Sequence, residues 1–217
     1  MTWDWSFVGH ILPAMLRGLR ITVEATLLGS VLAFALGLVF AIIRRARIPV
    51  LSQAVWLFIE FVRSTPLLVQ LYLLFFVLPH YGVTLSALTT GVLGLGVHYS
   101  TYSAEVYRAG IDAVPVEQWE ASTALSLPRW AVWVRVILPQ AIPRVIPALG
   151  NNVISMFKDS PQLLAITVID LVGAAQQAGA QAFRYVEPYT LAGLFFLAVS
   201  YPASIMLRRL ERRVRRQ

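Results

Sequence analysis

An uninterrupted apolar run, ITVEATLLGSVLAFALGLVFAII, occupies residues 21–43 and contains one charged residue, Glu24. At about 1.5 Å per residue, a helix over this run is long enough to cross the ~30 Å hydrocarbon layer of a bilayer. The whole chain has a similar character, because 58% of its 217 residues are hydrophobic and only 13% are charged. The sequence therefore predicts an all-α integral membrane protein.

Four further apolar segments have the length of a membrane span, which makes five predicted transmembrane helices. The additional segments cover about 53–78, 85–105, 140–157 and 189–207. Small residues in the third span, Gly91, Gly94 and Gly96, predict close packing on a neighbouring helix. Pro66 predicts a kink or break inside the second span. Since no repeat or change of composition divides the chain, we expect residues 1–217 to form one transmembrane domain.

The basic residues lie beside the apolar runs. The formal net charge of +7 would suit nucleic acid, but every basic residue except Lys158 is an arginine, and most flank a predicted span. This pattern is typical of a topology signal, and we expect no nucleic-acid partner. Arginines at 44–47, at 108–144 and at 208–216 predict the cytoplasmic side, so the protein is expected in the bacterial inner membrane with a cytoplasmic C-terminus.

The longest connection between predicted spans covers about residues 109–139. Pro115 suits the start of a short helix ending near Leu125, Pro128 suits the start of a second, and Pro139 is predicted to close the unit. Long connections of this kind usually carry function. We therefore expect two short helices that protrude into the cytoplasm.

The residues of this connection resemble the signature loop of permease subunits in ATP-binding-cassette (ABC) importers. That signature reads Glu-Ala-Ala, three residues, Gly, nine residues, Ile, one residue, Leu-Pro. The chain keeps its register with Glu120-Ala121-Ser122, then Ser126, then Val136-Ile137-Leu138-Pro139. Two further motifs, in residues 60–71 and 157–160, are similar to the polar amino acid branch of histidine, glutamine and arginine type. Residues 3–7, 98–102 and 183–188 look most like ectoine and hydroxyectoine permease subunits.

The chain departs from the signature most clearly at Ser126, where the family has glycine. Glycine permits a bend with positive φ, which serine enters only at a steric cost. Either the bend stays at negative φ, or Ser126 is mildly strained. The substitutions at Ser122 and Val136 are smaller changes.

The resemblance implies a type I importer permease fold and a coupling helix that inserts into a groove on an ATPase subunit. The residues assigned to this contact are Glu120, Ala121, Ser126, Leu127, Leu138 and Pro139. Trp119, Leu125 and Trp130 would add apolar contact. The alternative for Glu120 is a solvent-exposed acid without a role in the ATPase contact. The implied partners are ABC ATPase subunits, a second permease subunit that is a homologue or a second copy, and an extracytoplasmic solute-binding protein.

A second set of residues is expected near the solute path: Arg63, Thr65, Pro66, Lys158, Asp159 and Ser160. Arg63 follows Glu60 by three residues, so the two share a helix face and are predicted to neutralise each other in the membrane. Asp159 with a basic side chain suits the two charges of a zwitterion. An ordinary interfacial turn remains the alternative for residues 158–161. His98, Tyr99 and Tyr102 are assigned to helix packing, and contact with a ligand, by cation–π interaction for the tyrosines, is the alternative.

The sequence lacks the common motifs of membrane enzymes. The chain has no cysteine and no Gly-x-Ser-x-Gly or His-Glu-x-x-His motif, and its one lysine is followed by Asp159, so no phosphate-binding loop is present. We expect no catalytic residue, no metal and no cofactor. The predicted solute is ectoine or hydroxyectoine, and a polar amino acid such as glutamine, histidine or arginine is the alternative. A secondary transporter or channel that works without an ATPase is the alternative from another class.

Overall fold

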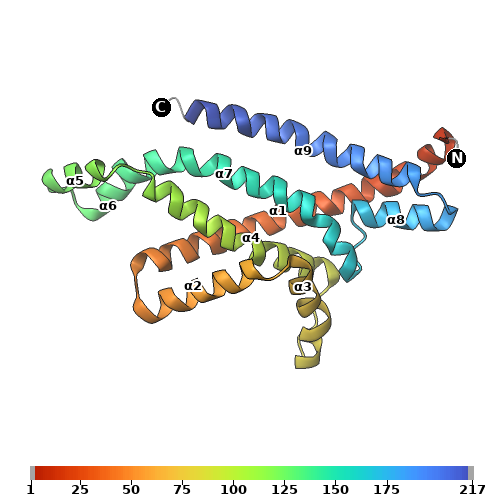
Figure 1. Ribbon diagram of the computed structural model, residues 1–217, viewed down its shortest axis with the longest axis horizontal. Coiled ribbons are helices and arrows are strands. Elements are labelled where there is room, and N and C mark those ends of the chain that lie inside the picture. Colours follow the sequence, from red (N-terminus) through yellow and green to blue (C-terminus); the bar gives the residue numbers. More distant parts are fainter. Residues whose placement is uncertain (1–2, 215–217) are drawn as a thin grey trace.

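The computed structural model describes residues 3–214, and every regular element within that range is a helix (Figure 1). The elements are α1 (Trp5–Ala46), α2 (Pro49–Ser64), α3 (Leu67–Tyr72), η1 (Leu73–Val77), η2 (Leu78–Tyr81), α4 (Ala87–Asp112), α5 (Val116–Ala124), α6 (Arg129–Ala131), η3 (Val132–Ile137), α7 (Leu138–Asp159), η4 (Ser160–Ile166), α8 (Leu171–Ala182) and α9 (Val186–Val214). The prediction of an all-α chain is confirmed for these residues. Arg215 and Arg216, which entered the topology argument, lie outside them.

The predicted count of five spans is not confirmed. Among the described residues, three helices are long and apolar enough to cross a bilayer: Trp5–Ala46, Arg129–Ile166 and Val186–Arg213. A fourth span is possible only if the bent pair Pro49–Ser64 and Leu67–Tyr81 counts as one. The predicted third span lies in α4, which does not meet the same test. Small and polar residues line much of α4, and they are buried against other helices, where an apolar surface is not required.

The C-terminal part of α1 packs along α4, and glycines allow the close approach. A Cβ added at Gly37 would lie 2.7 Å from the Ser103 Cβ, and one at Gly96 would lie 2.5 Å from Leu32. A Cβ at Gly94 would meet Leu71 of α3 at 2.5 Å. The predicted packing of the α4 glycines on neighbouring helices is therefore confirmed.

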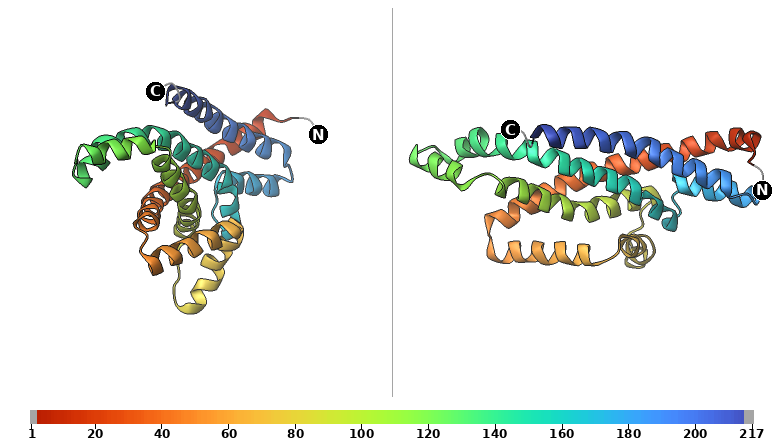
Figure 2. Two further views of the ribbon diagram at one scale, coloured as in Figure 1. Left: turned by 60° about the vertical axis from the view of Figure 1, so that its left-hand side comes forward. Right: turned by 45° about the horizontal axis from the view of Figure 1, so that its top comes forward.

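The predicted break at Pro66 is also confirmed. Helix α2 ends at Ser64, and the helical segment from Leu67 continues at an angle of 106° to it. Figure 1 and the left view of Figure 2 show that the segment that runs from α3 through η1 and η2 extends away from the bundle formed by α1, α4, α7 and α9. Pro66 is extended, with φ −60° and ψ 138°, and its missing N–H cannot continue the helix.

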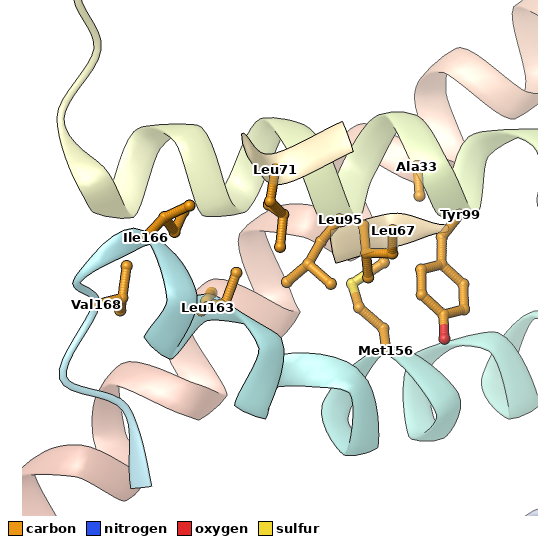
Figure 3. Close-up of a cluster of buried hydrophobic side chains, with 10 residues drawn as sticks. Ala33, Leu67, Leu71, Leu95, Tyr99, Met156, Leu163, Ile166 and Val168 are labelled. Atoms are coloured by element: carbon orange, nitrogen blue, oxygen red, sulfur yellow. The ribbon is translucent and has the colours of Figure 1, made fainter. Parts of the chain in front are cut away.

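The main hydrophobic core lies where α3 meets α1, α4, α7 and η4 (Figure 3). Leu67 and Leu71 from α3 contact Leu95 from α4, Met156 from α7 and Leu163 from η4. Leu71, Leu95 and Leu163 have no exposed surface. This core fixes the position of the break relative to the end of α7.

The prediction that Pro139 closes the second short helix is wrong. Residues Arg129–Ile166 form one continuous helical run through Pro139. Because proline has no N–H and its ring crowds the carbonyl four residues earlier, a regular α-turn would be broken there. The turns just before it, in η3 (Val132–Ile137), are wider π-turns, and this local change of hydrogen-bond register lets the helix continue past the ring.

Candidate functional site

The region 109–139 is mostly helical, and α5 is its protruding part. Pro115 precedes α5 and Pro128 precedes α6, as predicted. The chain leaves α5 through Ser126, which has φ +50°. The Ser126 N–H donates to the Thr123 carbonyl at 2.9 Å, and the Leu127 N–H donates to the Ser122 carbonyl at 3.1 Å. This pair of bonds is the left-handed helix ending that normally uses glycine, so Ser126 adopts the strained alternative.

An aromatic anchor holds α5 against the rest of the molecule. Trp119 of α5 meets Trp133 of η3 edge to face, with ring centroids 5.3 Å apart. The Arg45 guanidinium lies 5.2 Å from the centroid of each ring. Arg45 also forms an ion pair with Asp112 at 3.1 Å. The C-terminal end of α1 thus contacts α5. This link was not predicted, because in the sequence Arg45 is only one of the arginines that form the topology signal.

The outward side of α5 is open. Glu120 and Ala121 are exposed, and Leu125 has 73% of its surface exposed. Leu127 and Leu138 are half-buried, and Pro139 is exposed. Together with Trp130, which is 59% exposed, Leu125 leaves apolar surface uncovered in this region.

The side chain of Gln70 binds the broken end of α2. Its Nε2 donates to the Val62 carbonyl at 2.7 Å, to the Thr65 carbonyl at 3.0 Å and to the Thr65 Oγ1 at 2.8 Å. Carbonyls at the end of a helix otherwise lack partners. The Gln70 Oε1 lies 3.2 Å from the His98 Nδ1 of α4. Gln70 therefore connects the two halves of the break to α4.

Asp159, at the end of α7, is bound to α4. Its Oδ2 accepts a hydrogen bond of 2.6 Å from the Tyr99 hydroxyl. Tyr99 lies next to Tyr102, with ring centroids 5.9 Å apart, and the Arg63 guanidinium of α2 lies 5.3 Å from the Tyr102 ring. A cation and a carboxylate from distant segments are therefore joined through two tyrosines.

We call this set the polar cluster: Arg63, Thr65, Gln70, His98, Tyr99, Tyr102 and Asp159. Of the other residues predicted for the solute path, Pro66 and Lys158 are exposed, and Ser160 is fully buried. The predicted neutralisation of Glu60 by Arg63 is wrong, since no ion pair joins them within residues 3–214 and both are exposed. Arg63 faces the aromatic ring instead.

Gln70 was not predicted to be part of the site. His98, Tyr99 and Tyr102 were assigned to packing, and the structure places all three in the cluster. Their spacing did contain a signal, because residues 98 and 102 are four apart and lie on one helical face. The signal at Gln70 was weaker. It is a polar residue inside an apolar segment, just after Pro66.

Comparison with known proteins gives consistent matches over nearly the whole chain. The model of the family described as binding-protein-dependent transport system inner membrane component matches residues 25–216. The chain is 44% identical to the probable amino-acid ABC transporter permease protein y4tG of Sinorhizobium fredii, over 95% of this chain and 92% of that protein. It is 31% identical to the glutamine transport system permease protein GlnP of Escherichia coli, over 99% of both. A crystal structure of an amino acid ABC transporter with histidines superimposes with a TM-score of 0.92 at 35% identity, covering 98% of this chain and all of that one.

Proposed function

The chain belongs to the family of binding-protein-dependent transport system inner membrane components, and on this basis we propose that it is the permease subunit of an importer for a polar amino acid. It has the all-helical fold of type I ABC importer permeases. The observation that supports this class of solute is the polar cluster. In it, Arg63 and Asp159 provide opposite charges on one connected set of side chains.

The chemistry of the cluster suits a zwitterion. An amino acid carries a carboxylate, which a guanidinium binds through two parallel hydrogen bonds, and an ammonium group, which donates to a carboxylate. Arg63 would take the first role and Asp159 the second, while Thr65, Lys158 and Ser160 would border the path. The break at Pro66 lies beside these groups, and transporters that bind solutes at interrupted helices have a similar arrangement.

The same residues support a second permease subunit. Arg63, Glu60 and Lys158 are exposed in the single chain although they belong to segments that are otherwise apolar. A charged side chain facing lipid is costly, so this face is expected to line a water-filled path closed by another subunit. Whether that subunit is a homologue or a second copy, residues 1–217 act in this proposal as one transmembrane permease domain.

ATP hydrolysis is assigned to a partner. The relatives are permease subunits, which are not catalytic themselves. The exposed side of α5, with Glu120 and Leu125, would enter a groove on a cytoplasmic ATPase, and the continuous helix Arg129–Ile166 would carry the motion to Asp159. This arrangement puts the C-terminus in the cytoplasm and the solute-binding protein at the opposite face of the inner membrane.

Between the two solute classes, the comparisons favour the amino acid. The relatives are named for amino acids and glutamine, whereas the motifs that resemble ectoine permeases are short. Ectoine is also a zwitterion and would use the same two charges. The importer proposal therefore holds for both solutes, and the finer assignment depends on transport measurements.

Competitive uptake in cells with and without this gene tests the assignment. We expect labelled glutamine, histidine or arginine uptake to fall in cells without the gene, with ectoine a weak competitor in cells that carry it. Loss of ectoine uptake alone, with only hydroxyectoine competing, would replace the amino acid by a compatible solute. Unchanged uptake of all these compounds, or uptake that persists without any ATPase partner, would contradict the importer proposal itself.

A further inference from the structure

The corner between α1 and α2 contains an arginine in an unfavourable backbone conformation. Arg47 follows the last turn of α1 with φ 52° and ψ 32°, the left-handed region that favours glycine. Strained positions persist where the side chain or the geometry is needed. The turn itself needs only a residue with positive φ, so the arginine side chain points to a separate role.

The corner has an excess of positive charge. Arg44 is paired with Glu105, Arg45 with Asp112, and Arg108 with both acids. Within residues 3–214, Arg47 has neither an ion pair nor a hydrogen bond from its side chain, and it is exposed. Four arginines thus face two acids.

Two cavities open at this corner. One of about 520 Å³ is lined by Arg44, Arg45, Arg47, Arg108 and Asp112. The other, of about 330 Å³, is lined by Arg44, Arg47, Pro49, Ser52, Gln53 and Trp56. Arg44 and Arg47 contribute to both cavities. An anion in either cavity would therefore meet two guanidinium groups: that of Arg44, which is partly neutralised by Glu105, and that of Arg47, which is not neutralised.

The neighbouring surface of α2 is apolar and uncovered. Val50, Leu57 and Phe61 are 83%, 57% and 61% exposed, respectively, whereas α2 buries Val55 and Ile59 against the bundle. Trp56 is 43% exposed and lines the second cavity, with an apolar ring and a polar N–H as found at membrane interfaces. The basic cavity is therefore continuous with a surface suited to acyl chains.

We propose that this corner binds the phosphate headgroup of an anionic phospholipid, with Arg47 and Arg44 on the phosphate and the acyl chains along α2. The adjoining apolar face favours a lipid over a soluble anion or an acidic segment of a partner, because neither of these would cover Leu57 and Phe61. Basic cavities on the cytoplasmic side of membrane helices are suited to such headgroups. The inference does not depend on which solute is transported.

Native mass spectrometry of the assembled transporter in detergent, with added phosphatidylglycerol or phosphatidylcholine, tests the proposal. We expect phosphatidylglycerol to be retained in preference to phosphatidylcholine. Arg47→Gly keeps a residue suited to the turn and removes the charge, and it should weaken phosphatidylglycerol retention about fivefold, the effect expected of one basic residue at an anionic lipid. Arg47→Lys should restore most of it.

The matched control is Arg208→Ala, which removes an exposed arginine from α9. It should leave retention within about twofold, since a general attraction to positive charge is spread over many residues. Equal losses in Arg47→Gly and Arg208→Ala would overturn the proposal in favour of such a general attraction. Displacement of the lipid by glycerol phosphate at equal concentration would overturn it in favour of a soluble anion site.

Discussion

The region 109–139 and the polar cluster are built in opposite ways. All residues assigned to the ATPase contact lie within one stretch of sequence, 120–139, and two of them, Glu120 and Ala121, are exposed on α5. The polar cluster takes three residues from α4, one each from α2, α3 and α7, and Thr65 from the break, and it joins them by specific contacts, such as the 2.6 Å bond from Tyr99 to Asp159. A contact surface for a partner needs neighbouring residues on one helix. A solute site needs groups that converge from several directions.

This difference has an energetic consequence. Changes on the outer side of α5 leave the fold intact, because exposed side chains have few partners to lose. Changes in the polar cluster affect both transport and stability, because their side chains bind one another and the ends of helices. Four substitutions test this contrast.

The largest effect is expected from Asp159→Asn. The amide keeps the shape and can still accept from Tyr99, but it loses the charge proposed to bind an ammonium group, a contact of about 1.5–3 kcal/mol. The solute concentration for half-maximal uptake should rise about tenfold to a hundredfold. Tyr99→Phe, which leaves the carboxylate, should have a smaller effect. Normal uptake by the Asp159→Asn transporter would remove the polar cluster from the solute path.

Glu120→Lys should lower solute uptake about tenfold while leaving the amount of assembled complex in the membrane largely unchanged. A reversed charge in a partner's groove is repulsive, but an exposed side chain contributes little to folding. Uptake and ATP hydrolysis are measured on the same membranes. Glu117→Lys is the control, as another exposed acid on α5 outside the signature. If both variants transport equally well, Glu120 is a solvent-exposed acid without a coupling role.

Gln70→Leu should lower stability by about 1–3 kcal/mol, mainly the cost of leaving the partly buried Thr65 carbonyl without a donor, since the Val62 carbonyl keeps its bonds from the Thr65 N–H and hydroxyl. Val62 and Thr65 would lose the three bonds that Gln70 donates. The midpoint of thermal unfolding in detergent should fall by several degrees. Gln181→Leu makes the same exchange at an exposed position and should change little. Equal midpoints for the two variants would mean that the break does not depend on Gln70.

The smallest effect is expected from Ser126→Gly. Relief of the positive φ should exceed the entropy that glycine adds to the unfolded chain, for a net gain of about 0.5 kcal/mol. Leu125→Gly, at φ −80°, is the opposite control and should destabilise the protein. Thermal unfolding detects both. A loss of stability in Ser126→Gly would show that the serine hydroxyl outweighs the backbone strain.

The sequence predicted the helices, the break at Pro66 and the start of α5, because these follow from local rules of length, hydrophobicity and proline stereochemistry. It did not predict that the helix continues through Pro139, since the π-turns of η3 depend on packing around Ile137. It also assigned Arg63 to Glu60, a neighbour in sequence, where the structure gives it the ring of Tyr102.

The sequence alone thus determined the class of protein, its family signature and the region proposed to meet the ATPase, because each is recorded in consecutive or periodic residues. Only the tertiary structure decided that Gln70 holds the broken helix end, that Asp159 is bound by Tyr99, and that Arg45 lies against the rings of Trp119 and Trp133. These partners are separated by up to 88 positions or share no periodic pattern. Their meeting depends on how the helices pack, and the packing follows from the fit of many small and large side chains at once.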